Sequence, residues 1–127
     1  MRREMLRAKI HRISVTERDV EYEGSLTLDA DLMKACEMVP YERIDVYDVN
    51  NGNRFSTYLI EGAPGSGACG VNGAAAHLVE VGDKLILCAY ASVNEVDVPG
   101  HRPKVVLVTE DNRIRVVKDE ETAATRV

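Results

Sequence analysis

One stretch decides the fold: Arg43-Ile-Asp-Val-Tyr-Asp-Val-Asn-Asn-Gly-Asn-Arg-Phe-Ser-Thr-Tyr58. Polar and apolar side chains alternate along its first seven residues, the period-two pattern of a half-buried β-strand. Asn51-Gly52 is a preferred dipeptide of tight hairpin turns, and a return strand is expected from about Arg54 to Glu61. The stretch therefore predicts an antiparallel pair of strands.

Similar strand signals recur along the chain, separated by turn signals. Further strands are expected at residues 6–15, 20–22, 84–89, 104–109 and 113–118, with turns at 16–19 and 81–83 and loops at 62–67 and 92–103. Asp29 or Asp31 can cap a short helix through Leu32, Met33 and Ala35. Residues 74–77 read as a short helical turn, and the last residues are expected to fray. Many short strands in one small chain predict a closed or nearly closed β-barrel with short helices.

Composition sets the class of protein. The 127 residues suffice for one domain, and 45% apolar with 29% charged residues is a globular balance. The net charge of −5 argues against a nucleic-acid partner. No apolar run is long enough to span a membrane, and the start lacks the apolar core of a secretion signal.

The cysteines and histidines do not form a metal-site pattern. Cys36, Cys69 and Cys88 are odd in number and lack Cys-x-x-Cys spacing, so buried free thiols in a reducing cytoplasm are expected. None of the three histidines has ligand spacing with them, and no metal site is expected.

The dipeptide Gly24-Ser25 carries the most chemistry. A serine hydroxyl can attack the carbonyl of the preceding residue, and glycine at that residue reaches strained backbone angles and leaves its carbonyl open. The resulting ester can eliminate and hydrolyse to a pyruvoyl group, a ketone that forms a Schiff base with a substrate amine. On pattern alone, Gly-Ser is more often an ordinary turn.

Several separated motifs weigh against the ordinary turn. They are Met5-Leu-Arg-Ala-Lys-Ile-His-Arg12, Tyr22-Glu-Gly-Ser25, Val49-Asn-Asn-Gly-Asn-Arg-Phe-Ser-Thr-Tyr58, Gly65-Ser-Gly67 and Val71-Asn-Gly-Ala-Ala-Ala76. From about Met5 to Tyr90 the chain resembles the family of pyruvoyl-dependent aspartate 1-decarboxylases. The resemblance implies a six-stranded double-psi β-barrel and decarboxylation of L-aspartate to β-alanine and CO2 for pantothenate synthesis.

The resemblance also implies maturation and assembly. A single domain, 1–127, would cleave itself at Gly24-Ser25 into a β chain, 1–24, and an α chain, 25–127, whose first residue becomes the pyruvoyl cofactor. Family members are homotetramers with active sites between subunits. A maturation factor is a further candidate partner.

Two cations are candidate substrate ligands. Arg54 lies at the start of a strand, where a solvated arginine is the ordinary interpretation, but a guanidinium can hold a carboxylate through two parallel hydrogen bonds. The resemblance implies that Arg54 binds a substrate carboxylate and that Lys9 has a similar part. A lone strand lysine is otherwise solvated. The sequence does not assign either cation to a particular carboxylate.

The resemblance gives Thr57 and Tyr58 separate roles. Thr57 would assist cleavage by hydrogen bonding to the Gly24 carbonyl oxygen and would contact substrate, and Tyr58 would protonate the carbanion after CO2 leaves. Pattern alone suggests a cross-strand threonine and a core tyrosine. Strict alternation puts the two on opposite faces, so a barrel mouth, bulge or twist must bring both near Ser25.

A corner of small residues completes the candidate site. The resemblance places Asn72 and the backbone of Gly73, Ala74 and Ala75 in the substrate and processing site, and free amides at a helix start attract carboxylates. Asn72 is also a good helix cap. Weaker candidates for pocket walls are Tyr22 and Tyr47, and His11 could be either a pocket residue or a surface strand histidine.

Two other functions compete with the decarboxylase. Barrels of this kind also serve as unprocessed binding modules, although such a module has no reason to carry all these motifs. Alternatively, cleavage could leave Ser25 as a free N-terminal nucleophile for hydrolysis. Intact mass and a carbonyl-specific reagent separate these alternatives.

Overall fold

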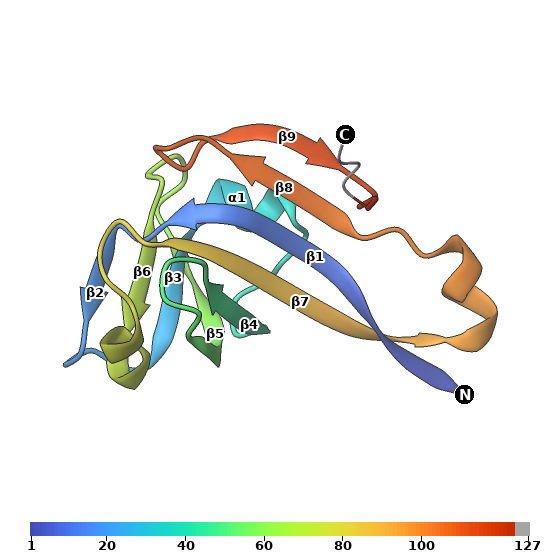
Figure 1. Cartoon of the computed structure of the whole chain (residues 1–127), viewed down its shortest axis with the longest axis horizontal. Helices are drawn as coiled ribbons and strands as arrows, with labels where there is room; N and C mark the ends of the chain where they lie inside the picture. The colour runs from blue at the N-terminus through green and yellow to red at the C-terminus, as the bar shows by residue number, and fades with distance from the viewer. Residues whose placement is uncertain (124–127) are drawn as a thin grey trace.

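Nine strands form one mixed sheet in the computed structural model, which describes residues 1–123 (Figure 1). The order across the sheet is β2-β6-β3-β5-β4-β7-β1-β8-β9. The strands are β1 (Arg2–Ser14), β2 (Glu17–Asp19), β3 (Ser25–Asp29), β4 (Arg43–Asp48), β5 (Arg54–Gly62), β6 (Cys69–Asn72), β7 (Lys84–Asn94), β8 (Lys104–Val108) and β9 (Ile114–Lys118). The helices are α1 (Ala30–Ala35) and the 3₁₀ segments η1 (Gly73–Leu78) and η2 (Glu95–Gly100).

The hairpin predicted at residues 43–61 is confirmed. β4 and β5 pair antiparallel from Arg43↔Tyr58 to Tyr47↔Arg54. Gly52 has a φ of 79°, the left-handed conformation that glycine adopts without steric cost. The hairpin places Arg54, Thr57 and Tyr58 on a strand near the middle of the sheet.

The longest pair, β1 with β7, exceeds the predicted strands at 6–15 and 84–89. It runs antiparallel from Arg2↔Asn94 to Ser14↔Lys84, with two register irregularities. The polar run Arg2-Arg3-Glu4 hides the start of β1, and the polar residues Ser92 and Asn94 gave the end of β7 the appearance of a loop. β8 and β9 form the expected terminal antiparallel pair.

The predicted turn at 16–19 and strand at 20–22 are wrong. β2 lies at Glu17–Asp19, and residues 20–22 form the turn. β3 and β6 were not predicted, because each is short and largely buried on both faces, and the alternation of Ser25-Leu-Thr-Leu-Asp29 is too brief to separate β3 from the turn expected at Gly24-Ser25. These two missed strands carry Ser25 and Asn72.

The helical predictions are confirmed in type. Asp29, one of the two proposed caps, accepts a hydrogen bond from the Asp31 amide at 2.8 Å at the start of α1. η1 covers the helical turn expected at 74–77. η2 lies inside the segment 92–103 that was expected to be a loop.

Aliphatic side chains fill the core, as the scarcity of aromatic residues requires. The largest fully buried ones are Ile10, Ile13, Leu26, Leu28, Leu32, Ile44, Val46, Leu59, Val71, Val79, Leu85 and Leu87. The cysteines are buried and free, as expected, and burial raises the pKa of the Cys36 and Cys69 thiols to about 12.

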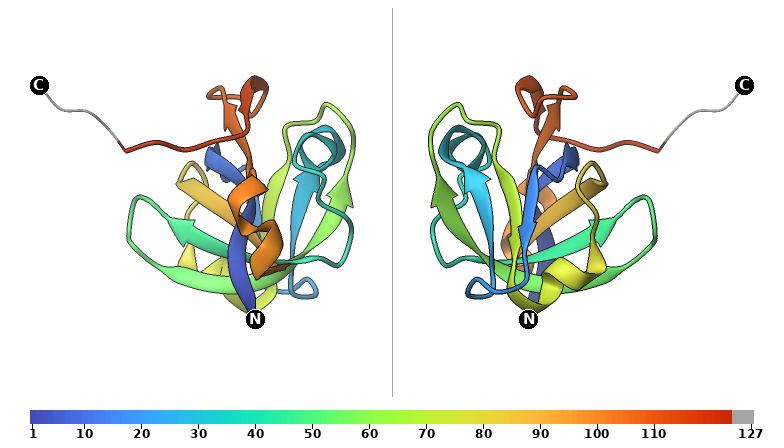
Figure 2. Two further views of the ribbon diagram at one scale, coloured as in Figure 1. Left: turned by 90° about the vertical axis from the view of Figure 1, so that its right-hand side faces the viewer. Right: turned by 90° about the vertical axis from the view of Figure 1, so that its left-hand side faces the viewer.

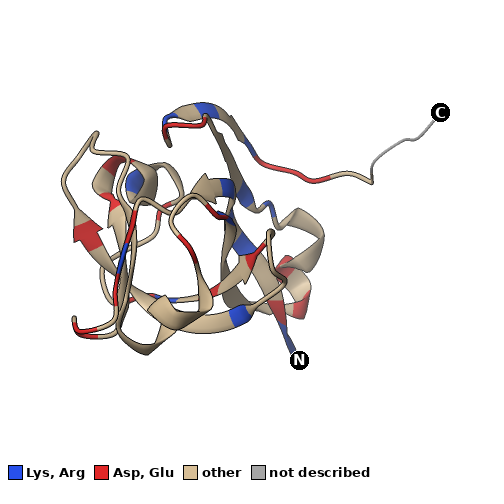
Figure 3. Ribbon diagram, turned by 60° about the vertical axis from the view of Figure 1, so that its left-hand side comes forward, with Lys and Arg blue, Asp and Glu red and all other residues tan. Residues whose placement is uncertain are grey.

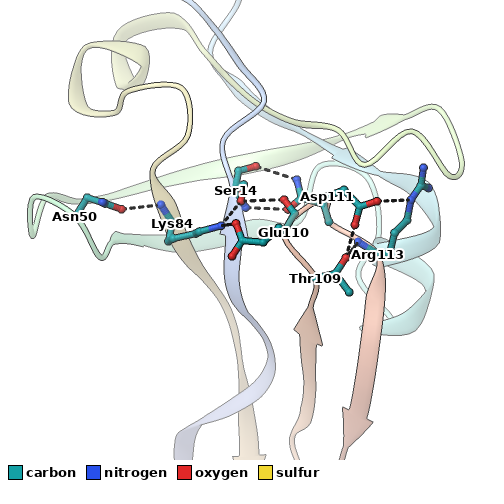
Figure 4. A network of polar contacts seen from close by, with 8 residues as sticks. Ser14, Asn50, Lys84, Thr109, Glu110, Asp111 and Arg113 are labelled. Carbon is teal, nitrogen blue, oxygen red and sulfur yellow. Dashed lines mark hydrogen bonds and ion pairs between the residues drawn. The ribbon is translucent and has the colours of Figure 1, made fainter.

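A polar network joins the hairpin tip between β8 and β9 to β1 and β7 (Figure 4). The Lys84 ammonium donates to Ser14 Oγ and to the Glu110 carboxylate, each at 2.6 Å. The Lys84 amide donates to Asn50 Oδ1 at 2.8 Å. This network ties the β4–β5 turn to the outer strands.

The fold is mainly β with short helices, as predicted. The sheet is strongly curled (Figure 2), but its strand order has two ends, β2 and β9, and nine strands where six were expected. Within residues 1–123, no helix has the length and apolar character to cross a membrane. The last residues were expected to fray, and residues 124–127 lie outside the described part of the chain.

Candidate active site

Ser25 is the first residue of β3 and has only 2% of its surface exposed. Its Oγ donates a hydrogen bond to the Glu23 carbonyl oxygen at 3.3 Å and accepts one from Asn72 Nδ2 at 3.0 Å. A hydroxyl that turns back toward the carbonyl two residues upstream lies beside the intervening peptide unit. The Ser25 side chain is therefore held against the backbone that contains the Gly24 carbonyl.

Asn72 bridges two hydroxyls of β3. It pairs with Ser25 across the antiparallel β3–β6 ladder, and its Nδ2 also donates to Thr27 Oγ1 at 3.1 Å. Its side chain makes no capping hydrogen bond to η1. The interpretation of Asn72 as a side-chain helix cap is therefore wrong, and the amide is directed at β3 instead.

Gly73 packs directly on Gly24. It has a φ of 74°, and a Cβ built on it would lie 2.7 Å from Gly24 Cα and 2.9 Å from Gly24 N. Real Cβ atoms do not approach backbone so closely, so only glycine allows this contact. Asn72 and Gly73 thus contact Ser25 and Gly24, the two residues that share the candidate scissile bond.

Gly24 itself differs from the expectation of a strained glycine. Its φ is not in the left-handed region, and nothing lies within 4 Å of a Cβ built on it. The steric requirement for glycine is at Gly73, which must leave room for the Gly24 backbone.

Lys9 and Arg54 lie on the same face of the sheet. Lys9 pairs with Cys88, Cys88 with Asp45, and Asp45 with Ser56. Directly paired residues share a face, and Arg54 shares it with Ser56, two residues along β5. Three strand spacings of about 4.8 Å separate the backbones of β1 and β5, so only the long side chains can approach each other.

Tyr58 shares this face, and so does Ser25. Leu26 pairs with Leu59 in the parallel β3–β5 ladder, and both side chains point into the core. The preceding residues, Ser25 and Tyr58, therefore lie at the same level along the strands and on the face away from the core. The Tyr58 side chain is exposed, at 38%, whereas Ser25 is buried. The register thus brings Tyr58 to the strand position beside Ser25.

Thr57 points away from that face. It pairs with Ile44, and β5 shows no register irregularity along β4 that would act as the expected bulge. Thr57 and Tyr58 nevertheless both line a shallow depression of about 290 Å³, together with Arg43 and Ser56. No hydrogen bond joins Thr57 to Gly24 among residues 1–123.

The Lys9 ammonium is occupied by a carboxylate of the same chain. It donates to Glu121 at 2.6 Å, and the Lys9 and Glu121 side chains are 17% and 42% exposed. Glu121 belongs to the acidic stretch that follows β9 (Figure 3). Lys9 is therefore a partly buried cation that already binds a carboxylate.

Arg54 has a different environment. Its Cζ lies 4.8 Å from the centroid of the Tyr47 ring, a cation–π contact across the β4–β5 pair. Within residues 1–123 the guanidinium forms no ion pair. Its donors are consequently available to an anionic ligand.

The remaining candidate residues differ in burial. His11 shares the Lys9 face, and its pKa is lowered by burial and then by the positive charge of Lys9, so the ring is neutral at physiological pH. Tyr22 is 54% exposed. On η1, Ala74 is exposed and Ala75 half-buried.

Sequence reasoning missed Thr27 and Tyr90. The alternation of Ser25-Leu-Thr-Leu-Asp29 would have placed the Ser25 and Thr27 hydroxyls on one face, had the segment been recognised as a strand. Tyr90 hydrogen bonds to Tyr47, and no local sequence signal marks that long-range contact.

Comparison with known proteins places this site in a family. The profile of the Aspartate decarboxylase family matches residues 1–115. The chain belongs to the aspartate decarboxylase family. The aspartate 1-decarboxylase of Ralstonia nicotianae is 54% identical over 118 residues, 93% of this chain and 98% of that protein. Those of Bordetella pertussis and Cupriavidus necator are 51% and 50% identical over the same share of the chain, covering 97% and 98% of their own lengths.

Membership of the aspartate decarboxylase family covers every candidate residue, since all lie within 1–115. The family is pyruvoyl-dependent. Glu121, the partner of Lys9, lies beyond the matched residues.

Proposed function

We propose that this member of the aspartate decarboxylase family cleaves itself between Gly24 and Ser25 and then decarboxylates L-aspartate to β-alanine and CO2. The products of cleavage would be a β chain, 1–24, and an α chain, 25–127, that begins with the pyruvoyl group. The observation that carries the proposal is the clamp around the candidate bond: Asn72 donates to Ser25 Oγ while Gly73 packs on Gly24.

Cleavage begins with attack of Ser25 Oγ on the Gly24 carbonyl carbon. The C–N bond breaks, the hydroxyl proton goes to the nitrogen, and an ester replaces the amide. Loss of the Ser25 Cα proton then expels the Gly24 carboxylate and leaves a dehydroalanine. Water replaces its nitrogen, releasing ammonia and leaving the ketone. No external oxidant or reductant is required.

Hydrogen-bond donors would stabilise the oxyanion formed in the first step. Thr57 is the proposed donor to the Gly24 carbonyl oxygen. Thr57 lies on the face of β5 opposite to Ser25, so this role requires a small local twist of β5. The twist would occur where Thr57 and Tyr58 line one depression. Asn72 orients the attacking hydroxyl.

The residues around Ser25 fit a pyruvoyl group. Ser25 Oγ leaves with the Gly24 carboxylate, so Asn72 Nδ2, which donates to Oγ at 3.0 Å, would be free to donate to the ketone oxygen on the former Ser25 Cα. The position is buried, which protects a reactive ketone from water. When formed, the group supplies a carbonyl that takes up the substrate amine and an electron sink for the pair left by CO2.

The chain's cations and amides hold the substrate. Arg54 binds one carboxylate through two parallel hydrogen bonds, and Lys9 is the second cation. The backbone of Gly73, Ala74 and Ala75 provides further contacts beside Ser25. Tyr58 donates its phenol proton to the carbanion.

Assembly completes the site. Arg54 and Tyr58 are exposed on the outer face of the sheet, and a neighbouring subunit of a homotetramer would exclude water from it. The curled sheet, with parallel pairs β1–β8 and β3–β5, suits a six-stranded double-psi β-barrel framework. Buried free thiols suit the cytoplasm, where a maturation factor could assist cleavage.

The test is an assay for β-alanine and CO2 from L-aspartate, with and without prior treatment by a carbonyl-specific hydrazine. We expect turnover that the reagent abolishes, and labelling of the chain that begins at residue 25. A cleaved chain that neither takes up the reagent nor turns over L-aspartate would indicate a free N-terminal serine instead. A full-length chain without turnover would indicate a binding module.

A further inference from the structure

The candidate anchor Arg54 rests on an aromatic ring. Arg54 and Tyr47 are directly opposite in the β4–β5 ladder, and the Arg54 Cζ is 4.8 Å from the Tyr47 ring centroid. An exposed arginine samples many rotamers, and stacking on a ring restricts them. The direction of the guanidinium is thus set by the position of the Tyr47 ring.

The Tyr47 ring is in turn held by a third strand. Its hydroxyl lies 3.1 Å from the hydroxyl of Tyr90 on β7, within hydrogen-bond distance. Tyr47 pairs with Ile86, and Tyr90 lies four residues further along β7 on the same face. The three side chains therefore form a chain of contacts across three neighbouring strands.

The neighbouring carboxylate does not compete for Arg54. Asp45 accepts a hydrogen bond from Ser56 Oγ at 2.6 Å and lies 3.9 Å from the Arg43 guanidinium. With Asp45 engaged by Arg43 and Ser56, the Arg54 guanidinium is left to the tyrosine ring.

We propose that Tyr90 is a positioning residue that acts through Tyr47 to orient the Arg54 guanidinium for a substrate carboxylate. The proposal rests on the proposed function of Arg54. In this proposal, Tyr90 itself contacts neither the substrate nor the reacting atoms. The hydrogen bond with Tyr47, followed by burial, raises the pKa of Tyr90, so the hydroxyl remains protonated over the working pH range.

The test removes one hydroxyl at a time. Tyr90→Phe and Tyr47→Phe each keep the ring and delete the same hydrogen bond. We expect each to raise KM for L-aspartate about threefold to tenfold, the range for one lost hydrogen bond, with kcat within about twofold of the parent. The inhibition constant of succinate, a dicarboxylate without the amine, should rise by the same factor.

The double variant gives the sharpest outcome. Since both substitutions break one bond, Tyr47→Phe/Tyr90→Phe should be no worse than either single variant. Tyr41→Phe is the matched control, because Tyr41 is 79% exposed and the substitution deletes a hydroxyl that lies outside the site. A parental KM in Tyr90→Phe, a multiplicative effect in the double variant, or a loss confined to kcat would overturn the proposal.

The two proposals fail in different ways. If the parent chain does not cleave and turn over L-aspartate, the proposed function fails. If the parent turns over and the phenylalanine variants keep its KM and succinate inhibition, only the role of Tyr90 fails. Intact mass confirms that each variant has cleaved before its kinetics are compared.

Discussion

At the scale of single residues, Gly73 has the most demanding position near Ser25. Gly73→Ala places a Cβ 2.7 Å from Gly24 Cα at a φ of 74°. We expect cleavage to slow by about tenfold or more, because displacement of Gly24 costs on the order of 1–3 kcal/mol. The measurement is the cleaved fraction by intact mass over time.

Gly82→Ala is the matched control for Gly73→Ala. Gly82 has a φ of 95° but nothing within 4 Å of a built Cβ. It therefore carries the backbone penalty without the clash. Equal cleavage rates in the two variants would contradict the role of the Gly73–Gly24 contact.

Tyr58→Phe separates cleavage from turnover. Cleavage needs nothing from the phenol, so the variant should process normally. Decarboxylation should slow by about 10²–10⁴-fold, the usual contribution of a positioned general acid. Steady-state kinetics on fully cleaved protein measure this, and a parental kcat would remove Tyr58 from the mechanism.

Much of the residue-scale site was predictable, but its contacts were not. Ser25, Arg54 and Tyr58 were identified from short motifs, and register places them on one face. Asn72 was expected to belong to the processing site and to cap a helix; its amide binds Ser25 and Thr27 and makes no capping bond. That choice depends on a strand 47 residues away in sequence, which local patterns cannot reveal.

At the scale of elements, the β4–β5 hairpin contains the buried carboxyl of Asp48, which lies beside half-buried Asp83 of the turn before β7. Asp48 Oδ1 accepts from the Asn50 and Asn51 amides, while its buried Oδ2 has no donor. Burial, followed by the adjacent Asp83 carboxyl, raises the pKa of Asp48 from 3.8 to about 6. A proton shared by the two carboxyls would satisfy Oδ2.

Asp48→Asn should therefore stabilise the protein at pH 8. Between about pH 4 and 6 the folded wild type binds more protons than the unfolded chain, so its stability falls as pH rises through that window. Asparagine keeps the acceptor and donates to Asp83 without a charge. We expect a gain of about 1–3 kcal/mol at pH 8 that shrinks below pH 4.

Denaturant unfolding of Asp48→Asn at pH 4 and pH 8 checks this. Asp97→Asn, at an exposed position in η2, is the control for loss of one negative charge. If Asp48→Asn and Asp97→Asn changed the free energy of unfolding by the same amount at each pH, the buried Asp48 carboxyl would not be the cause of the change.

The segment after β9 has its own test. Glu121 holds the Lys9 ammonium at 2.6 Å. If Lys9 binds substrate as proposed, Glu121 would compete with a substrate carboxylate for it. Glu121→Gln should lower KM for L-aspartate about twofold to fivefold, the range for a partly exposed ion pair. Glu120→Gln, one residue away, controls for charge. A KM in Glu121→Gln equal to that of the control would contradict the competition.

Elements with clean alternation or turn chemistry were predictable, and doubly buried ones were not. Alternation and Asn51-Gly52 predicted β4 and β5 in position and pairing. β3 and β6 are only five and four residues long and are largely buried on both sides, so the brief alternation of Ser25-Leu-Thr-Leu-Asp29 and the mixed Cys69-Gly-Val-Asn72 gave no clear strand signal. Parallel pairing of β3 with β5 also joins residues far apart in sequence, which no local signal encodes.

At the scale of the whole molecule, one outer face of the curled sheet gathers the candidate residues. Lys9, Arg54, Tyr58 and Ser25 come from three strands, β1, β5 and β3. β7 and β4 lie between β1 and β5 and set the spacing between them. The aliphatic core on the other face fixes that register, because a one-residue slip would exchange the faces. A second subunit on the outer face would turn an open surface into a closed site.

Intact mass of the wild type beside Ser25→Ala tests the central claim most directly. The wild type should give a chain of residues 1–24 and a second chain lighter than its serine-ended form by one ammonia, whereas Ser25→Ala should remain one full-length chain. A full-length wild type, a serine-ended fragment, or cleavage of Ser25→Ala at the same bond would contradict the account.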